Sequence, residues 1–217
     1  MLNIQTVPVT PFGQNCRIIA DTQHAAALAV DVGGDAGIIH RLLQQQGLQC
    51  RAVLLTHGHL DHVGGAMELS ALCGGCPVYG PHEDDRFLFE ALDTQARAFG
   101  LDFCAPFMPQ FLDDNQELEL LGGVVFRALL TPGHTPGSLC YYCAQERFVL
   151  VGDVLFAGSV GRTDFPRGSL PDLETSIRSR LYALPGETAV LPGHGPNTTI
   201  AAEMLDNPFV PALPSGL

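Results

Sequence analysis

The chain has 217 residues, of which 46% are hydrophobic and 16% are charged, a composition typical of a folded globular enzyme rather than a disordered or fibrous protein. Only 11 basic residues stand against 23 acidic ones, so no nucleic-acid partner is predicted, because such a partner needs a basic surface. Residues 1–10 lack the basic and apolar segments of a secretory signal, and the longest apolar stretch, 118–130, is broken by charged residues and glycines. We therefore expect a cytoplasmic protein with no membrane partner.

Apolar, strand-like segments alternate with amphipathic, helical segments in the first half of the chain. A helix over residues 35–46 follows a Gly-Gly turn and is closed by Gly47. After a helix at 83–91, residues 92–110 show no regular pattern and are predicted to form a long surface loop or a lid. The other predicted elements are strands at 2–9, 16–20, 26–31, 51–55 and 77–79, and a helix at 63–72.

Strands dominate the second half of the chain. They are followed by one helix, 170–181, and a last strand, 188–191. Strands at both ends of each half, with helices between them, predict two packed sheets covered by helices. No linker interrupts the pattern, so residues 1–217 are predicted to form a single domain. The remaining predicted strands are residues 117–120, 124–130, 138–143 and 147–151.

The seven cysteines favour free thiols in a reducing compartment, because their number is odd and a chain of this length needs no disulfide. Cys140 and Cys143 lie on a predicted strand at an odd offset, so their side chains should point to opposite faces of the sheet. Cys73 and Cys76 flank a Gly-Gly turn and could bind a metal or form a disulfide. No second pair follows at zinc-finger spacing, which favours free thiols here too.

Five of the eight histidines lie in glycine- or proline-rich loops that directly follow predicted strands. Loops at strand ends are where rigid scaffolds present catalytic groups. His24, His40 and His82 lie outside such loops and are explained as ordinary surface or core histidines. The loops read T-H-G-H-L-D-H at 56–62, T-P-G-H-T-P-G at 131–137 and P-G-H-G-P at 192–196, and a fourth strand is followed by G-D at 152–153.

The spacing within these loops indicates metal binding. His57 and His59 are two residues apart, so in extended chain both imidazoles face the same side and can share one metal. Asp61 and His62 follow where the chain turns into a helix, and this change of direction can aim them at a second metal. Divalent metals about 3.5–4 Å apart can share a hydroxide, which is a strong nucleophile at neutral pH. The sequence therefore predicts a two-metal hydrolytic centre.

These motifs resemble the metallo-β-lactamase superfamily, and within it the glyoxalase II (hydroxyacylglutathione hydrolase) branch. The resemblance covers nearly the whole chain, from D-x-G-G at 31–34 through the histidine loops, and includes G-R-T-D-F-P-R-G at 161–168. It implies an α/β fold, a four-layer αββα sandwich with the site at one edge. It implies that His57, His59 and His134 bind the first metal, that Asp61, His62 and His194 bind the second, and that Asp153 bridges the two.

The resemblance also implies the chemistry. A hydroxide shared by the metals, oriented in part by the catalytic carboxylate of Asp61, would hydrolyse an S-acyl glutathione such as S-lactoylglutathione to lactate and glutathione. Zinc is the expected metal, although the ligands also suit iron or manganese. Arg162 matches a basic residue near the glycine carboxylate of glutathione, and Arg167 is a weaker candidate of the same kind. Alternatively, Arg162 forms a structural ion pair with Asp164 or Asp172.

The chain departs from full-length glyoxalase II at its end. It extends only about 23 residues beyond His194, and Val210 and Pro211 stand where a basic residue is expected after N-P-F at 207–209. This is the pattern of the short, YcbL-like type, for which no C-terminal glutathione-binding helical domain is expected. The oligomeric state is left open.

Three alternatives are compatible with the motifs. A persulfide dioxygenase of the same fold would use a single iron on His57, His134 and Asp153 and would consume oxygen. The chain could also be another metal-dependent hydrolase, or a non-catalytic metal-binding protein, although the open ligand set disfavours a purely structural site. β-Lactamases of the best-known class carry cysteine at the position of Asp153, so antibiotic hydrolysis is not the first prediction.

Overall fold

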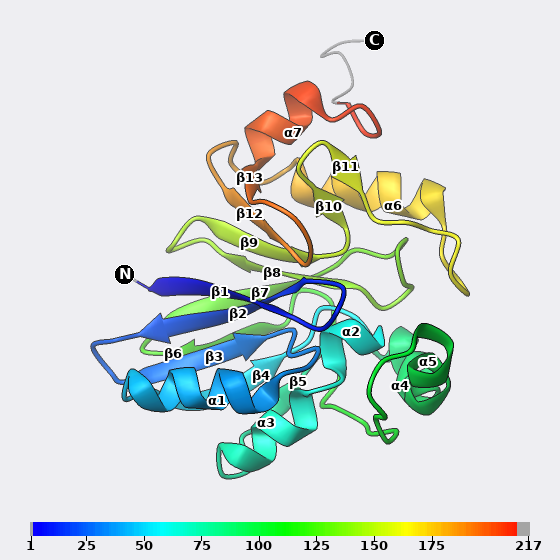
Figure 1. Ribbon diagram of the computed structural model, residues 1–217. Coiled ribbons are helices and arrows are strands. Elements are labelled where there is room, and N and C mark those ends of the chain that lie inside the picture. The colour runs from blue at the N-terminus through cyan, green and yellow to red at the C-terminus, as the bar shows by residue number, and fades with distance from the viewer. Residues whose placement is uncertain (1, 212–217) are drawn as a thin grey trace.

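Two β-sheets pack face to face, and helices cover their outer faces, in the computed structural model, which describes residues 2–211 (Figure 1). The first sheet has the strand order β1-β2-β3-β4-β5, and the second has the order β13-β12-β9-β8-β7-β6. The first sheet comprises β1 (Asn3–Val9), β2 (Gln14–Asp21), β3 (Ala26–Val30), β4 (Gln49–Leu54) and β5 (Val78–Tyr79). The second comprises β6 (Glu117–Leu121), β7 (Val124–Leu130), β8 (Leu139–Cys143), β9 (Phe148–Gly152), β12 (Ala189–Pro192) and β13 (Thr198–Thr199).

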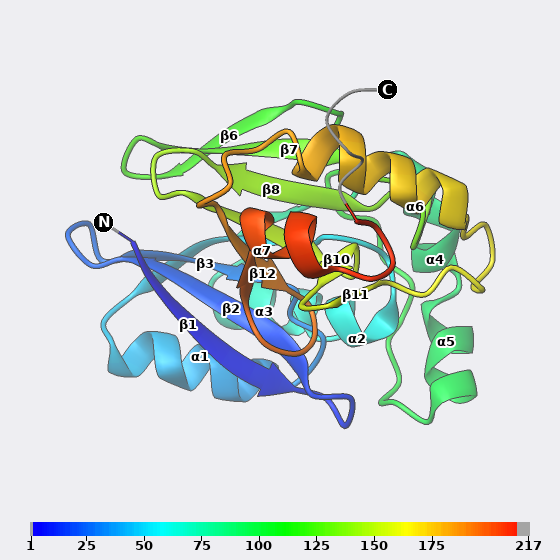
Figure 2. The same cartoon turned by 90° about the horizontal axis from the view of Figure 1, so that it is seen from above.

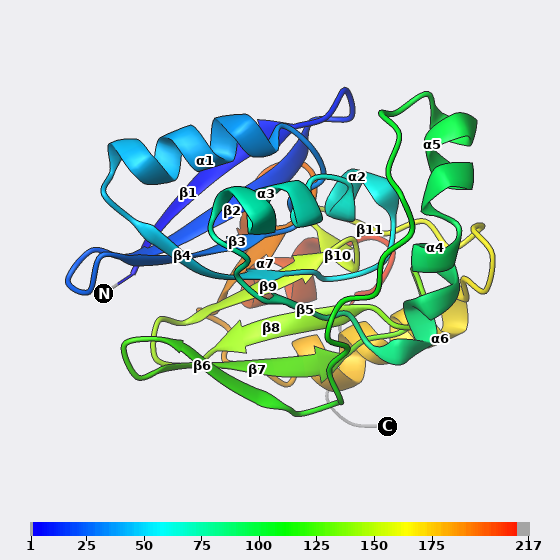
Figure 3. The ribbon, with the colours of Figure 1, turned by 90° about the horizontal axis from the view of Figure 1, so that it is seen from below.

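The helices fall into two outer layers and one group at an end of the sandwich (Figures 1 and 3). Helices α1 (Ala36–Gln45) and α3 (Ala66–Leu72) cover the first sheet. Helix α6 (Leu170–Ser176), which continues as a π-helical turn η2 (Ile177–Leu181), and α7 (Ile200–Asp206) cover the second sheet. The group at the end comprises α2 (Leu60–Val63), a 3₁₀ turn η1 (Glu83–Asp85), α4 (Arg86–Glu90) and α5 (Leu92–Phe99), and a small hairpin pairs β10 (Leu155–Phe156) with β11 (Ser159–Val160).

The alternation of side chains along each strand creates three separate apolar layers. On β3, Leu28 and Val30 face the second sheet, whereas Ala27 and Ala29 face α1 and α3. Strand β9 repeats the pattern, with Leu150 between the sheets and its neighbours under α6. Because both faces of these strands are buried, their sequences read as continuous apolar runs. Three apolar layers between four layers of structure give the αββα sandwich, so the predicted fold is confirmed.

Most predicted elements are present with ends that agree to within two residues. Cys140 lies beneath α6 and Cys143 lies between the sheets, so the prediction of opposite faces is confirmed. The helix predicted over 63–72 is wrong in detail. It is two helices, α2 and α3, separated at Gly64 and Gly65, and its start at Leu60 places Asp61 in the first helical turn.

The long loop predicted after residue 91 is also wrong, because α5 occupies its first eight residues. The inward face of α5 carries Gln95 between Leu92 and Ala96, and a buried glutamine weakens the apolar periodicity that would indicate a helix. The strands β10, β11 and β13 were not predicted, because two-residue strands fall below the length of any sequence pattern, and the seven-residue helix α7 was not predicted either. No helix within residues 2–211 has the length and apolar character needed to cross a membrane.

Four strands end at the same edge of the sandwich and place their following loops together. Strands β3 and β4 are parallel, and β9 and β12 are parallel, while β7 runs in the direction of β9 because both pair antiparallel with β8. Helices α2, α4 and α5 lie at this edge (Figures 2 and 3). The loops after β4, β7, β9 and β12 carry the residues discussed next.

Candidate metal centre

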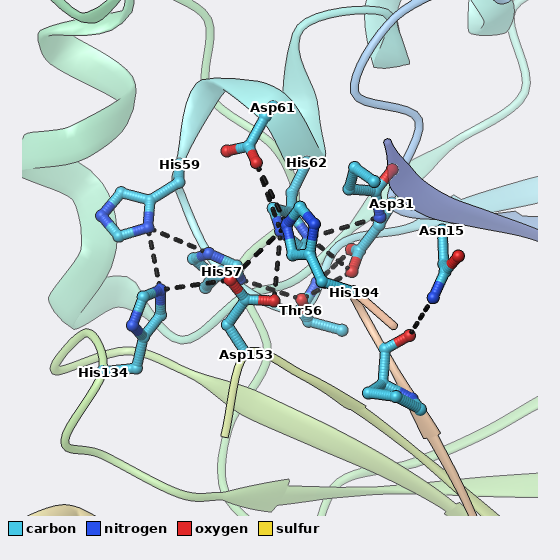
Figure 4. Close-up of polar contacts among 12 residues, drawn as sticks. Asn15, Asp31, Thr56, His57, His59, Asp61, His62, His134, Asp153 and His194 are labelled. Carbon is cyan, nitrogen blue, oxygen red and sulfur yellow. Dashed lines mark hydrogen bonds and ion pairs between the residues drawn. The ribbon is translucent and has the colours of Figure 1, made fainter. Parts of the chain in front are cut away.

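Seven histidine and aspartate side chains converge where these loops meet (Figure 4). Strand β4 leads into Thr56, after which His57 and His59 precede α2, and α2 carries Asp61 and His62. The structure brings together all seven residues that the sequence predicted as metal ligands. The other three are His134 after β7, Asp153 after β9 and His194 after β12.

Three imidazoles form what we call the histidine group: His57, His59 and His134. His59 Nδ1 lies 3.0 Å from His57 Nε2 and 3.0 Å from His134 Nε2, so three nitrogen lone pairs point at one place. Burial lowers the pKa of His59 to about 3 and also lowers the pKa of His57 and His134. All three are therefore neutral at pH 7, the form in which imidazole binds a metal.

The second set, which we call the mixed group, contains Asp61, His62 and His194. His194 Nε2 lies 3.3 Å from Asp61 Oδ2, and His62 Nε2 lies 3.8 Å from the same oxygen. Burial alone would lower the pKa of His62, but the carboxylates of Asp153, Asp61 and Asp31 outweigh it and raise that pKa well above the ordinary value. The pKa of His194 is raised too, because its bond to Asp61 and the charge of Asp153 outweigh burial.

Asp153 lies between the two groups. Its Oδ1 is 3.4 Å from His62 Nε2, and its Oδ2 is 3.7 Å from His194 Nε2 and 3.8 Å from His134 Nε2. Asp153 Oδ1 and His62 Nε2 are buried with no hydrogen-bond partner among the described residues. Buried polar atoms without partners are rare, and a ligand accounts for them. Imidazole and carboxylate donors suit divalent metals, so these residues fit two adjoining cations.

Glycines make this convergence possible at two points. A Cβ on Gly193 would lie 2.4 Å from Asp153 Oδ1 and 2.5 Å from His62 Cε1, which no side chain tolerates. A Cβ on Gly33 would lie 1.5 Å from the carbonyl oxygen of Asp61. The Gly-Gly turn after β3 therefore lets α2, which carries Asp61 and His62, come close to this turn.

Asp31 orients two of the imidazoles. Its Oδ2 accepts hydrogen bonds from His62 Nδ1 at 2.9 Å and from the Thr56 hydroxyl at 2.7 Å. The Thr56 oxygen lies 3.1 Å from His57 Nδ1, which can donate to it. Both imidazoles thus use Nδ1 for the protein and turn Nε2 toward the centre. His134 does the same, because its Nδ1 lies 2.7 Å from the backbone oxygen of Arg162 and donates to it.

Two further side chains hold the loops rather than the ligands. Asp85 is fully buried and accepts hydrogen bonds from Gly58 N, Gly137 N and the Thr135 hydroxyl, thereby joining the loops of His57, His59 and His134. Gln95 on α5 accepts from Leu60 N and donates to the carbonyl oxygens of Gly58 and Leu88. Sequence reasoning assigned no role to Asp31, Asp85 or Gln95, since each is distant in sequence from the loop it holds.

The His194 loop is fixed from the first hairpin of the chain. Asn15 on β2 donates its backbone N–H to Gly193 O, and its side-chain amide donates to the oxygens of Pro192 and Gly195. Figure 4 shows one of these side-chain bonds. The buried Arg17 donates to Pro192 O and to the side chain of Asn197. Strand β2 and the loop after β12 are therefore one hydrogen-bonded unit.

The two arginines predicted as substrate contacts lie in different places. Arg162 is exposed, lines the cavity beside the metal centre and forms a bidentate ion pair with Asp164, with both N···O distances 2.6 Å. Arg167 lies over the ring of Phe87 and donates to the backbone oxygen of Asp84. The structure thus brings Arg162 to the site and turns Arg167 away from it, and substrate contact by either stays a prediction.

All seven cysteines lie among the described residues and are free. The Cys73–Cys76 pair does not form a disulfide. Instead, the Sγ atoms of Cys76 and Cys50 lie 4.0 Å apart in the layer under α1 and α3. None of the His/Cys/Asp/Glu groups found within residues 2–211 that could hold a metal includes a cysteine.

Comparison with known proteins agrees with this geometry. The profile of the metallo-beta-lactamase superfamily matches residues 9–194. Hydroxyacylglutathione hydrolase GloC of Haemophilus influenzae is 42% identical over 210 residues, which cover 96% of this chain and 98% of that protein.

Two solved structures superpose over nearly the whole chain. The crystal structure of BLEG-1, a B3 metallo-beta-lactamase, is 35% identical with a TM-score of 0.87, and the match covers 96% of this chain and 99% of that one. The crystal structure of TTHA1623 in a di-iron-bound form is 38% identical with a TM-score of 0.84, covering 94% and 99% of the two chains. The chain belongs to the metallo-beta-lactamase superfamily and is one of its metal-dependent hydrolases.

Proposed function

We propose that this protein hydrolyses S-acyl glutathione thioesters, with S-lactoylglutathione as the first substrate to test. The observation that carries the proposal is the pair of adjoining donor groups that share Asp153, together with the similarity to a hydroxyacylglutathione hydrolase over nearly all of both chains. We assign His57, His59 and His134 to one metal and Asp61, His62 and His194 to the other, with Asp153 between them.

Two bound divalent metals would supply a Lewis acid for the thioester carbonyl and a water molecule of lowered pKa. The protein's own groups set the geometry around that water. Asp61 Oδ2 faces His62 and His194 and is only partly buried, so it can accept a hydrogen bond from the attacking water and orient it. The new C–O bond replaces the C–S bond, and the acid is released as a carboxylate.

The leaving group places little demand on the protein. A thiol has a pKa of about 8.5, so the thiolate that departs is stable enough to leave without a strong general acid and takes its proton from solvent. This agrees with the cavity beside the centre, which within the described chain offers no lysine or free carboxylic acid poised to protonate a leaving atom.

We further propose that the metals are zinc, with iron or manganese as the alternatives, because imidazole and carboxylate ligands suit all three. We propose a cytoplasmic location, where seven free thiols stay reduced. We also propose that residues 1–217 form one domain that acts on a small-molecule substrate without a nucleic-acid or membrane partner.

The test combines metal analysis with two assays on the purified protein. We expect about two metal ions per chain, hydrolysis of S-lactoylglutathione that is lost on chelation and restored by added metal, and no oxygen consumption. Oxygen uptake with glutathione persulfide and a single iron per chain would favour the persulfide dioxygenase instead. Two bound metals without hydrolysis of any acyl-thiol would refute the proposal.

A further inference from the structure

The cavity beside the metal centre has a volume of about 580 Å³ and largely apolar walls. Three aromatic rings form one continuous wall that begins at the histidine group. Phe165 packs against His59 with ring centroids 4.7 Å apart, Phe99 packs against Phe165 at 6.2 Å, and Phe12 packs against Phe99 at 6.5 Å. Leu101, Phe156 and Val160 extend this apolar surface. Phe12 and Phe99 are 48% and 45% exposed, so much of the wall is open to a ligand.

The polar groups of the same cavity are few, and most are already used. All three hydrogen bonds of the Gln95 amide go to the backbone of Leu60, Gly58 and Leu88. Outside the metal centre, only Ser159 and Arg162 remain as polar lining residues among those described.

Arg162 is also partly neutralised. Its guanidinium pairs with both oxygens of Asp164 and lies 4.3 Å from the centroid of the Phe165 ring. The chain contains no lysine, and Arg167 is bonded to Asp84 O away from the cavity. Glutathione carries two carboxylates, and a strong site for it would present several unpaired cations. This cavity presents one, and that one already has a carboxylate partner.

These observations fit a substrate held by an apolar group. We propose that the enzyme selects thioesters by an apolar, preferably aromatic, acyl group that packs against the Phe12–Phe99–Phe165 wall, and that the carboxylates of the thiol contribute little to recognition. The inference rests on the proposed thioester hydrolysis and narrows its substrate class. The thioester carbon then lies next to the histidine group, because the wall begins at His59.

The experiment compares two substrates that share an α-hydroxyl group, S-lactoylglutathione and S-mandeloylglutathione, which differ by a phenyl ring in place of a methyl group. Each buried methylene-sized group adds about three- to fourfold to binding, so kcat/KM should favour the mandeloyl substrate by about tenfold or more. A third substrate, S-mandeloyl-N-acetylcysteamine, lacks both carboxylates of glutathione. Its kcat/KM should fall by less than about threefold, because only weak ion pairing is lost.

A wall variant and a matched control locate the effect. Phe99→Ala should reduce the mandeloyl-to-lactoyl ratio to about threefold or less, because it removes the ring between Phe12 and Phe165. Phe209→Ala removes a ring of similar exposure, 56%, that does not line the cavity, and it should leave the ratio unchanged. Calorimetric titration supplies a second readout, in which S-benzylglutathione should bind about tenfold more tightly than S-methylglutathione.

The outcomes separate the two proposals. If the metal-loaded enzyme hydrolyses none of the thioesters, the proposed function and this inference fail together. If kcat/KM for S-lactoylglutathione equals that for the mandeloyl substrate, thioester hydrolysis stands and the inference is overturned. A loss of more than about tenfold with the N-acetylcysteamine thioester would also overturn it, because the thiol would then dominate recognition.

Discussion

The histidine group and the mixed group share Asp153, yet the protein prepares them in different ways. The histidine group consists of imidazoles whose pKa burial lowers, and its loops are joined through their backbones by Asp85. The mixed group contains a carboxylate, and the imidazole of His62 is bonded directly to Asp31. The buried carboxylate of Asp85 thus holds the loops of the histidine group through their main chain, whereas the buried carboxylate of Asp31 bonds directly to a ligand side chain of the mixed group.

The two groups would also receive a cation in different ways. Neutral imidazoles can bind a metal without losing a proton. The raised pKa values of His62 and His194 mean that these side chains retain a proton more strongly, and a metal must displace it. The negative charges of Asp61 and Asp153 attract a cation to the mixed group and so compensate for the displaced proton. The two halves should therefore respond differently when their supports are removed.

Asp153→Ala should have the largest effect, because it removes the one carboxylate whose oxygens approach both groups. We expect metal content to fall to one ion or fewer and thioester hydrolysis to fall by about a thousandfold, since a Lewis acid contributes several kcal/mol. Metal analysis and steady-state kinetics measure both. Asp206→Ala, at an exposed aspartate on α7, is the control. If Asp153→Ala kept two metals and full activity, Asp153 would not link the histidine group to the mixed group.

Asp31→Asn should lower the metal affinities of the mixed group and the histidine group by different amounts. The change keeps a side chain that tolerates the left-handed backbone of this residue, where φ is 53°, but it replaces one acceptor oxygen with an amide. Asp31 bonds His62 directly but reaches His57 only through Thr56, so metal affinity of the mixed group should fall by about 10- to 100-fold and that of the histidine group by less. Competition with a chromophoric chelator would resolve the two sites.

Thr56→Val is the comparison for Asp31→Asn. It breaks only the link between Asp31 and His57 and leaves the bond from His62 Nδ1 to Asp31 in place. We expect a smaller loss of affinity, confined to the histidine group. If both variants lowered the metal affinity of both groups equally, the centre would respond as one unit. The histidine group and the mixed group would then not be supported separately.

Asp85→Asn should change how the free energy of unfolding depends on pH, because Asp85 titrates while it holds the loops of the histidine group. Burial raises the pKa of Asp85 to about 6 from an ordinary value of 3.8, although the bonds from Thr135, Gly137 and Gly58 oppose that rise. The folded protein therefore binds a proton at Asp85 more tightly than the unfolded chain does. The stability that this proton contributes is complete below about pH 4 and is lost as pH rises through 6.

The wild type should therefore lose about 2 kcal/mol of unfolding free energy relative to Asp85→Asn between pH 4 and pH 7. Urea denaturation of the chelator-treated protein measures this trend. Asp102→Asn, at an exposed position, should leave it unchanged. A constant difference between wild type and Asp85→Asn across this range would contradict the expectation.

Arg162→Ala should have the smallest effect on the metal centre. The residue supports His134 through its backbone oxygen, which the substitution retains. We expect unchanged metal content and unchanged metal affinity of the histidine group. Loss of metal from that group would mean that the guanidinium, and not the carbonyl, holds the loop.

The loops that carry the candidate metal ligands could be predicted because their information is local. The two-residue spacing of His57 and His59 predicted convergent imidazoles, and their nearest nitrogens lie 3.0 Å apart. The apolar runs that became β3 and β9 were readable because a strand buried on both faces needs no polar residue. Their assembly into a four-layer sandwich followed from the resemblance and is confirmed.

What could not be predicted depends on contacts between distant residues. Asp85 lies 27 residues after Gly58 and 52 before Gly137, and nothing in its acidic surroundings distinguishes it from its exposed neighbours. Gln95 interrupts the apolar face of α5 because its amide is needed by the α2 loop, and the same residue hid the helix. The direction of Arg167 is set by Phe87 and Asp84, which only the folded chain brings near.

The bonds from Asn15 and Arg17 to the loop after β12 have a consequence for biosynthesis. Asn15 and Arg17 bond to residues 175 to 180 positions later in the sequence, in the loop that presents His194, so these bonds can form only after that loop has been synthesised. Contacts this remote in sequence form late. The mixed group is therefore completed only by the loop after β12, long after His57 and His59 have been synthesised.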